Sequence, residues 1–486
     1  MKRYVLSLSI LKKKQNAPLS STSTVANLRR ECPTLAAAVW TAVLLLCTAV
    51  SAAAQCTGPG APAATETKCL TAIPIQGNPI RSFDISWVDP ERGLYFLADR
   101  SNKGVDIIST KTNTFIGRAG DALGPGSFVG IVPAPPAPVN NNHSGPDGVV
   151  SRGNCLYAGD GDSTLKVFDI SDPTTPVFVK SIPTGGGTRL DEMAMTADGK
   201  FLIAVNNSED PPFATLFAVD GDDGCDAISI VGPSIKADAS LIPTGKGLSI
   251  EQPTWVESTH TFIVSVPTIA NNPTDPPGCN FDTSVPPVTC SGAVLLIDPN
   301  NVENPVKNGF VPLVHCGPNG ATVGPHSNVM VGCTPNNQKG DNETTIINAK
   351  NFKYVDVGNL TGSDEVWFDR GSGRYYTGSS AMPGGAVLGV VDGETNFLLE
   401  TIPQSSASHS VAADSRRHKV FVPQVAPKNV VGLGGDVTGP TKDGIGGVGA
   451  GICGTTNGCI AVYAVPRAED KNDEEGDHGD HGDGRD

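Results

Sequence analysis

The sequence predicts an all-β protein, a seven-bladed β-propeller built of four-stranded antiparallel blades. The first observation is the stretch 82–110, where three short apolar runs are separated by the polar turns DPERG and DRSNKG. Short runs bounded by Gly, Pro, Asp and Asn are typical of antiparallel strands joined by tight turns. The second observation is that six later segments repeat this plan. A repeat of about 40 to 60 residues with three or four strands per unit is the pattern of a propeller.

The strands can be taken in order within each unit. The first runs are DISWVD, DGVVS, DEMAMTAD, QPTWVE, NGATVG, DEVWFD and HSVAAD. The second runs are LYFLAD, CLYAGD, KFLIAV, TFIVSV, VMVGC, RYYTGS and KVFVPQ. The third runs are GVDIIS, LKVFDI, TLFAVD, AVLLID, TTIINA, AVLGVV and CIAVYAV. An outer run follows most units, as TFIGRAG, VFVKSIPTG, FVPLVHCG, KYVDVGN and FLLETIPQ.

The ends of the repeat indicate how the ring closes. The last unit stops at Val465 without an outer run, whereas a spare run of that type, CLTAIPIQG, precedes the first unit at 69–77. If this strand pairs with the last blade, two sheet edges that would otherwise be exposed are removed. We therefore expect the final blade to take its outer strand from about 69–77.

The remaining segments divide the chain into domains. Residues 1–54 carry basic residues, a short apolar run and the small-residue sequence SAAAQ, which together predict an export signal; a single retained anchor helix is the alternative. An N-terminal extension (55–68), the propeller (69–466) and an acidic tail (467–486) follow. The tail has almost nothing apolar to bury and is expected to be disordered. The four inserts 124–142, 222–247, 271–289 and 425–451 are expected to shape one mouth of the channel. The predicted location is secreted or periplasmic.

Charge and cysteine content agree with export. The chain has 35 basic and 50 acidic residues; without the seven bases and one acid of 1–54, 28 and 49 remain, a net charge of −21. Nucleic acid is excluded as a partner because phosphate binding needs a basic face. We expect a monomer without a membrane span in the mature chain. Its ten cysteines predict disulfides, although sequence does not fix their pairing. The candidate pairs are Cys56–Cys69, Cys279–Cys290, Cys316–Cys333, Cys453–Cys459 and, by elimination, Cys155–Cys225.

Candidate site residues stand just ahead of the first strands, where a propeller blade meets the mouth of the central channel. They are Asp84, Asp147, Asp191, Glu192, Glu251, Gln252, Asn319, Asp364, Glu365 and His409. His143 can reach the mouth from its loop, whereas His326 is expected in a hairpin turn away from it. An oxygen-rich ring suits a divalent cation, Ca²⁺ first and otherwise Mg²⁺, Mn²⁺ or Zn²⁺. Clustered carboxylates also raise one another's pKa, which makes one of them a candidate general base.

These residues have three interpretations. Polar side chains can simply cap strand ends at a wet channel mouth, and Asp or Asn before Gly is common in turns. They can also bind a ligand or metal without turnover, or they can be catalytic. Trp87, Trp255 and Trp367 occupy matching positions in three first strands and are expected to pack within the blades.

The steps PDGVV, PNGAT, MTADGKFLIAV and SHSVAAD resemble the NHL and YVTN repeats of secreted propellers. That superfamily includes lactonase-like, gluconolactonase/regucalcin-like and streptogramin lyase-like members, and the resemblance covers about 69–466. The gluconolactonase-like enzymes hold a divalent metal with Glu, Asn and Asp at first-strand starts; the resemblance implies Asp84 in place of the Glu, with Asn319 and Asp147. The lyase-like members use His and Glu with a metal, which implies His409 with Glu365. These motifs specify a blade rather than an activity.

The sequence therefore predicts a secreted propeller with an acidic channel mouth, acting as a metal-dependent hydrolase or lyase on a small lactone or ester. Asp84, Asp147, Asn319 and Asp364 would be metal ligands, and His409 or Glu365 would move the proton. The alternative is a non-catalytic binding or scaffold propeller for an extracytoplasmic protein or a small-molecule partner. A cofactor-dependent dehydrogenase is disfavoured because the chain has no haem motif and few aromatic residues.

Overall fold

The computed structural model describes residue 56 and residues 65–464, apart from gaps at 121–122, 135–136, 221–223, 239–241, 243–248, 271, 274, 276–289, 335–342, 427–451 and 454–456. The predicted export signal and acidic tail lie outside the described residues. Seven antiparallel sheets account for all the named strands. Apart from short 3-10 turns, the named elements are β-strands, as predicted.

Each sheet is one blade, and in every blade but the seventh the strands follow chain order from the channel outward. Blade one is β2 (Ser86–Asp89), β3 (Leu94–Asp99), β4 (Gly104–Ser109) and β5 (Thr114–Ala119); blade two is β6 (Val149–Arg152), β7 (Cys155–Gly159), β8 (Thr164–Asp169) and β9 (Val177–Pro183). Blade three is β10 (Met193–Met195), β11 (Phe201–Asn206), β12 (Phe213–Val219), β13 (Ile228–Ile230) and β14 (Ile235–Lys236). Blade four is β15 (Pro253–Val256), β16 (Thr261–Val266), β17 (Ala293–Ile297) and β18 (Val306–Pro312).

The second half of the ring follows the same plan. Blade five is β19 (Gly317–Val323), β20 (Asn328–Thr334), β21 (Thr344–Asn348) and β22 (Tyr354–Val357). Blade six is β23 (Val366–Asp369), β24 (Arg374–Ser379), β25 (Val387–Asp392) and β26 (Leu398–Pro403). Blade seven joins β27 (Ala412–Asp414), β28 (Lys419–Gln424) and β29 (Cys459–Ala464) to β1 (Lys68–Pro74) from the start of the chain.

An aspartate at the end of the first strand organises the first hairpin in several blades. Asp89 Oδ1 accepts hydrogen bonds from the backbone N–H groups of Glu91 and Arg92, both at 3.0 Å. Asp369 and Asp414 make the same type of turn in blades six and seven. Such local side-chain bonds favour a turn over a continued strand. The repeated acid is therefore a folding signal at this end of the blade.

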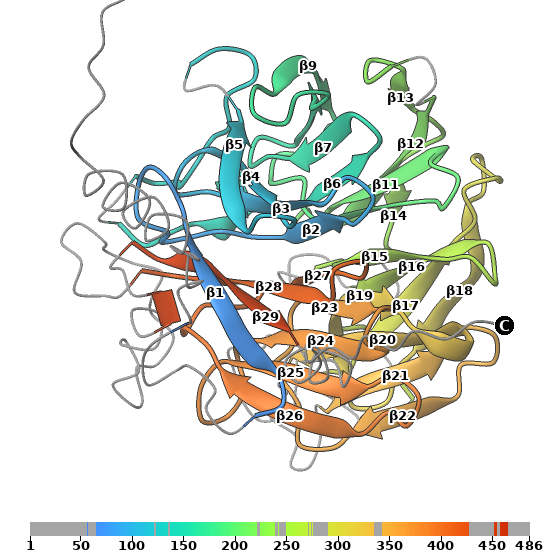
Figure 1. Cartoon of the computed structure of the whole chain (residues 1–486). Coiled ribbons are helices and arrows are strands. Elements are labelled where there is room, and N and C mark those ends of the chain that lie inside the picture. The colour runs from blue at the N-terminus through green and yellow to red at the C-terminus, as the bar shows by residue number, and fades with distance from the viewer. Residues whose placement is uncertain are drawn as a thin grey trace, which may run out of the picture. The chain divides into compact units, whose positions relative to one another are not determined.

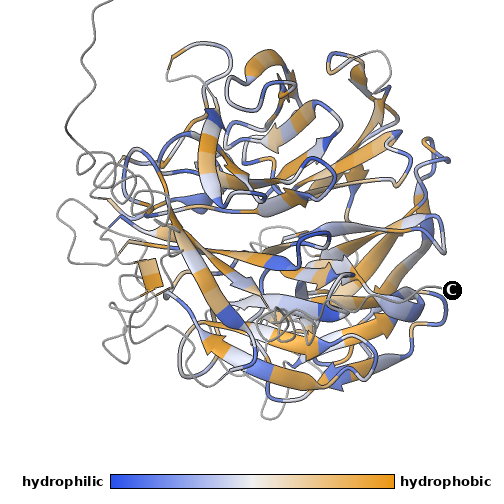
Figure 2. Ribbon diagram, viewed as in Figure 1, coloured by the Kyte–Doolittle hydropathy of each residue, from blue (hydrophilic) through white to orange (hydrophobic). Residues whose placement is uncertain are grey.

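Innermost strands of successive blades contact one another around the ring, and β27 contacts β2. The hydrophobic clusters lie between neighbouring blades: one joins Ile85 and Val105 of blade one to Val149 and Leu156 of blade two. Middle strands are apolar along most of their length (Figure 2), which matches their burial on both faces. The core is thus a set of sheet-to-sheet interfaces arranged around the channel.

The ring closes as the sequence predicted. Strand β1 pairs antiparallel with β29, from Lys68 opposite Ala464 to Pro74 opposite Cys459, and the two lie side by side in Figure 1. The predicted strand at 69–77 is observed at 68–74. Ile73, which is 2 % exposed, joins the apolar cluster between blades seven and one.

Blade three departs from the simple repeat, because its outer position is filled by two short strands. Both β13 and β14 pair with β12, at opposite ends of that strand. They come from the insert predicted at 222–247, which carries no continuous outer run.

Disulfides join Cys56 to Cys69, Cys155 to Cys225, Cys316 to Cys333, and Cys453 to Cys459. These are four of the five predicted pairs. The fifth involves Cys279, which lies outside the described residues. In the part of the chain that the structure describes, we find no helix of the length and apolar character needed to cross a membrane.

Candidate functional site: the channel mouth

One backbone hydrogen bond, repeated from blade to blade, places the predicted acids at the channel mouth. In each case the residue ahead of the first strand donates its N–H to a carbonyl of the second strand. The pairs are Asp84 to Ala98, Asp147 to Gly159, Asp191 to Val205, Glu251 to Ser265 and Asp364 to Gly378, at 2.7–3.0 Å. Equivalent backbone positions in five blades therefore carry a carboxyl group, which is why the acids form a ring.

The glycines that follow two of these positions have a packing role. A Cβ on Gly148 would lie 2.0 Å from the carbonyl oxygen of Asp191, and a Cβ on Gly320 would lie 2.1 Å from that of Asp364. The PDG and PNG steps thus let the entry strand of the next blade approach closely.

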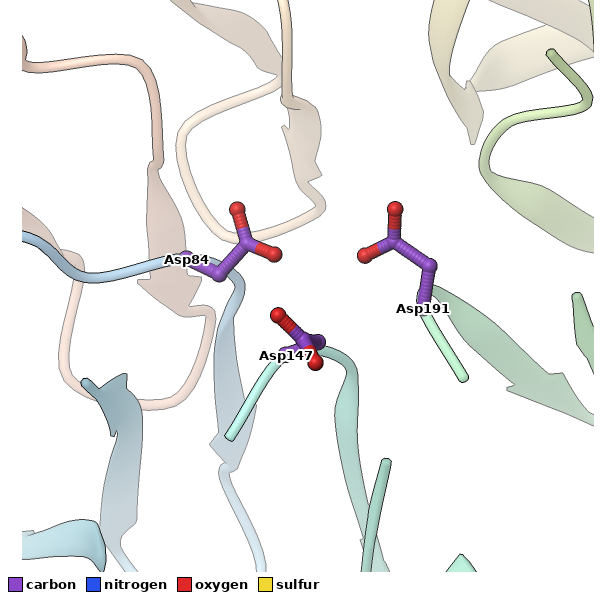
Figure 3. A group of neighbouring side chains, drawn as sticks. All are labelled: Asp84, Asp147 and Asp191. Carbon is purple, nitrogen blue, oxygen red and sulfur yellow. The ribbon is translucent and has the colours of Figure 1, made fainter. Parts of the chain in front are cut away.

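Asp84, Asp147 and Asp191 converge from three successive blades (Figure 3). One carboxylate oxygen from each lies within 4.8 Å of the others, and all three residues are buried. Geometrically the group resembles a metal site. Its charge is nevertheless already matched by protein cations.

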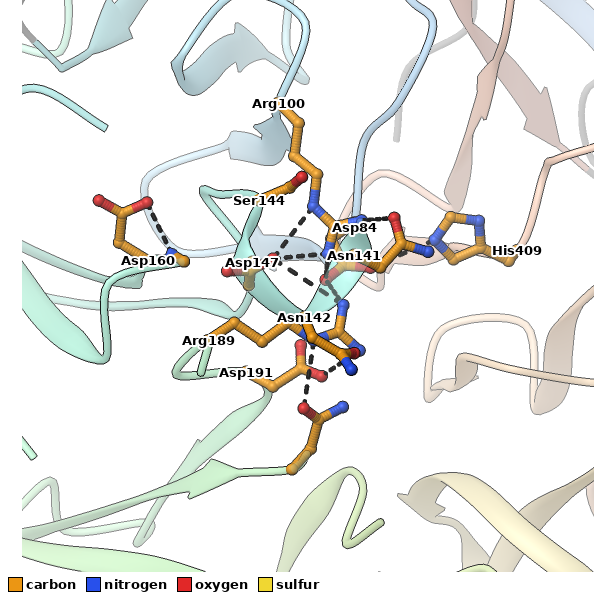
Figure 4. A network of polar contacts seen from close by, with 12 residues as sticks. Asp84, Arg100, Asn141, Asn142, Ser144, Asp147, Asp160, Arg189, Asp191 and His409 are labelled. Carbon is orange, nitrogen blue, oxygen red and sulfur yellow. Dashed lines mark hydrogen bonds and ion pairs between the residues drawn. The ribbon is translucent and has the colours of Figure 1, made fainter. Parts of the chain in front are cut away.

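Arg100 is the first of these cations (Figure 4). Its side chain is 2 % exposed and forms an ion pair with Asp84. Its Nε and Nη2 donate to Asp147 Oδ1 at 3.0 and 2.5 Å, and Nη1 donates to Asn141 Oδ1 at 3.2 Å. Arg100 follows β3 directly, so the end of the second strand carries the counter-charge for first-strand acids.

Arg189 is the second cation. It donates from Nη1 to Asp84 Oδ2 at 3.2 Å and from Nε to Asn207 Oδ1 at 3.2 Å, and its Nη2 lies 2.7 Å from Asp191 Oδ2. Burial alone would lower the pKa of this guanidinium, but the surrounding carboxylates raise it further above its usual range. Arg189 therefore remains charged and ties the acids of three blades together.

His409 is the third cation. Its Nδ1 donates to the Ala407 carbonyl at 2.8 Å, and its Nε2 faces Asp84 Oδ1 at 3.4 Å. The ring stacks on Phe83 with 4.7 Å between centroids. Burial by itself lowers the pKa of His409, but the hydrogen bond to Asp84 and the charges of Asp364 and Asp84 raise it to about 9.

Asp84 is consequently surrounded by positive charge. Burial would raise its pKa, but Arg100, Arg189 and His409 together hold it well below its usual range. Both of its oxygens accept from these cations. Asp84 is therefore held in its ionised form by three cations.

The ring acids outnumber these cations. Seven carboxyl groups (Asp84, Asp147, Asp191, Glu192, Glu251, Asp364 and Glu365) face three cations (Arg100, Arg189 and His409), a surplus of four. Burial, followed by the charges of the neighbouring carboxyls, raises the pKa of Glu192 well above its usual range. Burial also raises the pKa of Glu251 to about 7, although Arg189 opposes the rise.

Several carboxyl oxygens have no hydrogen-bond partner within the described part of the chain. They are Asp147 Oδ2, Asp191 Oδ1, Glu192 Oε2 and Glu365 Oε1. Buried polar atoms of this kind are uncommon in folded proteins and call for a proton, a water or a ligand.

Glu365 has its other oxygen committed to the scaffold. Its Oε2 accepts from the backbone N–H of Ser86 at 3.3 Å and of Val411 at 3.1 Å, and from Ser410 Oγ. Glu365 thus joins blade six to blades seven and one. The structure records no side-chain hydrogen bond between it and His409, although the backbones of the two residues are bonded at 3.1 Å.

The amides among the predicted residues are also engaged. Asn319 Nδ2 donates to Asp364 Oδ1 at 3.4 Å, which brings these two predicted ligands together. Gln252 Oε1 accepts from the backbone N–H of Ala321 at 2.7 Å and links blades four and five.

His143 is exposed in a 3-10 turn, Asn141–His143, and does not line the mouth cavity. His326 lies in the β19–β20 turn, as expected, and pairs with Glu394 at 2.9 Å.

The tryptophans do more than pack within their own blades. Trp87 of blade one and Trp367 of blade six meet edge to face, with 5.2 Å between ring centroids. Blade seven lies between blades one and six in the ring, so this contact joins two blades that are not neighbours.

A cavity of about 390 Å³ opens at the mouth. Its lining includes the acids Asp84 and Asp364, the cations Arg100, Arg189 and His409, and a further arginine, Arg81. Sequence reasoning found the acids but missed all three arginines. A signal was present, because Arg100 follows the second run in LYFLADR and Arg189 precedes the acid pair in TRLDE.

Comparisons with known proteins match a repeat family over one blade of the chain. The LVIVD repeat family matches residues 147–184, which is blade two. No curated protein sequence matches the chain. Among solved structures, Kuenenia stuttgartiensis hydrazine synthase is similar at 13 % identity over 72 % of this chain and 96 % of that chain, with a TM-score of 0.49. A chain of a mitotic checkpoint complex is similar at 10 % identity over 86 % and 96 %, with a TM-score of 0.44. The resemblance to NHL and YVTN repeats stays a prediction.

Proposed function

We propose that the channel mouth binds a divalent cation together with a small ester or lactone, and that the protein is an extracytoplasmic hydrolase or lyase. The observation that carries the proposal is the surplus of buried or half-buried carboxyl groups at the mouth, where seven face the protein's own four cations, Arg81, Arg100, Arg189 and His409. An uncompensated buried charge is costly, so the surplus must be balanced by protons or by a bound cation. The four disulfides support the location, because such bonds persist in oxidising compartments.

We assign the cation to Glu192 and Asp364, for which the structure shows no ion pair with Arg100 or Arg189. A metal beside Asp84 would meet Arg100 and Arg189 at close range, and like charges repel. Glu192, Glu251 and Asp364 interact with one another electrostatically. Glu192 keeps an open oxygen, and Asn319 contacts Asp364. An all-oxygen set of this kind suits Ca²⁺ or Mg²⁺, with Mn²⁺ as a third choice.

A bound cation would supply Lewis acidity toward a carbonyl oxygen. The chain itself supplies the proton transfer. With a pKa of about 7, Glu251 can accept a proton from water at neutral pH while the water oxygen bonds to the carbonyl carbon. The C–O ester bond then breaks and the proton passes to the departing alkoxide. His409 holds positive charge near this group instead of acting as the base, because both of its ring nitrogens are engaged.

The test is metal content of the purified full-length protein by plasma mass spectrometry after exhaustive dialysis. We expect one tightly held divalent ion per chain in the wild type, and its loss in Glu192→Gln and Asp364→Asn. Glu303→Gln is the matched control, since Glu303 is an exposed acid outside the mouth. The acidic tail is present in every variant, so its contribution cancels. Wild type and variants should then be assayed on a panel of lactones and esters.

A non-catalytic binding propeller is the second candidate. It is favoured by the ion cluster itself, since Arg100 and Arg189 give Asp84, Asp147 and Asp191 a structural role. If the protein retains no ion, and if adding Ca²⁺, Mg²⁺, Mn²⁺ or Zn²⁺ does not shift its melting temperature, the hydrolase proposal is wrong. The non-catalytic binding propeller then remains.

A further inference from the structure

Arg81 differs from the other two arginines of the mouth cavity. It is 7 % exposed and lines the cavity, yet its Nη2 has no hydrogen-bond partner. Within the described part of the chain its guanidinium forms no ion pair, whereas Arg100 and Arg189 each contact at least two carboxylates. Arg81 Nη2 is therefore a covered hydrogen-bond donor at the cavity wall for which the described residues supply no acceptor.

The backbone on either side of Arg81 is fixed. Its own N–H donates to Ser101 Oγ at 2.8 Å. The preceding residue, Ile80, donates to the Asn457 carbonyl at 2.8 Å and accepts from the Ala426 N–H at 2.7 Å. Arg81 is therefore held at the junction of blades one and seven and does not belong to a loose surface loop.

Arg81 is the cation of the cavity lining for which the structure shows no carboxylate partner in the described part of the chain. Four cationic residues line the cavity (Arg81, Arg100, Arg189 and His409) against two acids, Asp84 and Asp364. Arg100 and Arg189 also pair with Asp147 and Asp191, and His409 pairs with Asp84. Asp84 cannot satisfy Arg81, because both of its oxygens already accept from other cations. The lining also includes Ser380 and Ser406, whose hydroxyl groups can donate to an anion.

We propose that Arg81 is the anchor for a carboxylate group of the ligand that occupies the mouth cavity. The planar guanidinium fork matches a carboxylate, and a charge-assisted hydrogen bond in a covered site is strong. The proposal rests on the mouth being a ligand site, as in the proposed function, and it specifies that the ligand carries a carboxylate in addition to any group facing Glu251. The cavity then has an anion-binding wall at Arg81, and Asp364, one of the surplus acids, lines the same cavity.

The binding test uses glycolate as the probe and glycolamide, its uncharged amide, as the comparison. Both are titrated into the full-length protein and followed by ligand-observed NMR. We expect glycolate to bind the wild type and to bind Arg81→Met about 10- to 100-fold more weakly. Arg81→Lys should be intermediate, because it keeps the charge and loses the fork. Arg370→Met, which removes an exposed arginine outside the cavity, should bind as the wild type does.

Thermal stability is a second measurement, and it distinguishes an arginine that binds a ligand from one that only stabilises the fold. Replacing an unpaired buried charge with an apolar side chain of similar length should leave the Tm unchanged or raise it. Arg100→Met removes a charge that pairs with Asp84 and Asp147, so it should lower the Tm markedly. If Arg81→Met lowers the Tm as much as Arg100→Met does, Arg81 is a structural residue and the proposal is wrong.

The outcomes separate this inference from the proposed function. If glycolate binding depends on Arg81, the inference is supported. If the same protein retains no metal, the proposal of a metal-dependent hydrolase is wrong. Retained metal with no glycolate binding overturns the inference and leaves the hydrolase standing. Equal binding of glycolate and glycolamide, or equal binding to the wild type and Arg81→Met, also overturns it.

Discussion

His409 shows how single residues at the mouth make stability depend on pH. Burial lowers the pKa of His409, whereas the hydrogen bond to Asp84 and the charges of Asp364 and Asp84 raise it. The net result is a pKa near 9, against 6.5 for an ordinary histidine. A raised pKa in the folded state stabilises the fold below the ordinary pKa, and the contribution is lost as pH rises through the folded value.

We therefore expect the wild type to lose stability between about pH 7 and pH 10 relative to His409→Gln. The difference is at most about 3 kcal/mol, the equivalent of the pKa change. It is measured as the gap between the two denaturant midpoints at each pH. Lysine and tyrosine titrations occur in both proteins and cancel. Parallel pH profiles would show that His409 is not held as a cation.

The acids of the mouth could be predicted from sequence, and their partners could not. Asp84, Asp147 and Asp364 occupy one repeated position, ahead of the first strand, so counting units is enough to find them. Arg100 follows a second strand and Arg189 lies in a loop, so no single repeat position contains them. Arg100 meets Asp84 within blade one, whereas its contact with Asp147 and the contact of Arg189 with Asp84 form because the ring brings different blades together. The sequence pattern predicts metal ligation from the acids alone, because it does not show which arginines will pair with them.

At the scale of elements, the Cys155–Cys225 disulfide ties β7 of blade two to the segment just before β13 of blade three. It closes a loop of 70 residues, whereas Cys453–Cys459 closes one of only six. Cross-links that close longer loops remove more entropy from the unfolded chain. The outer position of blade three also needs this support, because β13 pairs with β12 over only three residues.

Removing Cys155–Cys225 by paired alanine substitution should accordingly cost about 2–4 kcal/mol. Removing Cys453–Cys459 in the same way should cost less. The free energies of unfolding from denaturant titrations, all without reductant, make the comparison. An equal or larger loss for the short loop would mean that local packing, and not loop closure, sets the contribution of these bonds.

Strand positions were largely predictable because polar turns and short apolar runs alternate regularly along most of the chain. Blade three shows where the signal fails. Its outer position has no continuous apolar run, and two short strands from an insert fill it instead. Pairing of that kind depends on the exposed edge of β12, which exists only after the blade has formed.

At the scale of the whole molecule, the closing strand determines whether seven blades unfold as one unit. Strand β1 hides the edge of β29, and Ile73 fills the apolar cluster shared with Phe83 and Tyr95 of blade one. Each sheet then has a neighbour on both sides, and the ring offers no free end from which unfolding could start. An open ring would instead lose its terminal blades first, because they would have one neighbour each.

Ile73→Ala tests this directly. Truncating a buried isoleucine should cost about 2–5 kcal/mol through lost burial and a residual cavity. If the closed ring is cooperative, the whole transition shifts and stays single by both fluorescence and circular dichroism. Ile203→Ala, at an equally buried site in β11 of blade three, should give a shift of the same kind. A new early transition in Ile73→Ala but not in Ile203→Ala would mean that β1 docks onto a ring that is already stable without it.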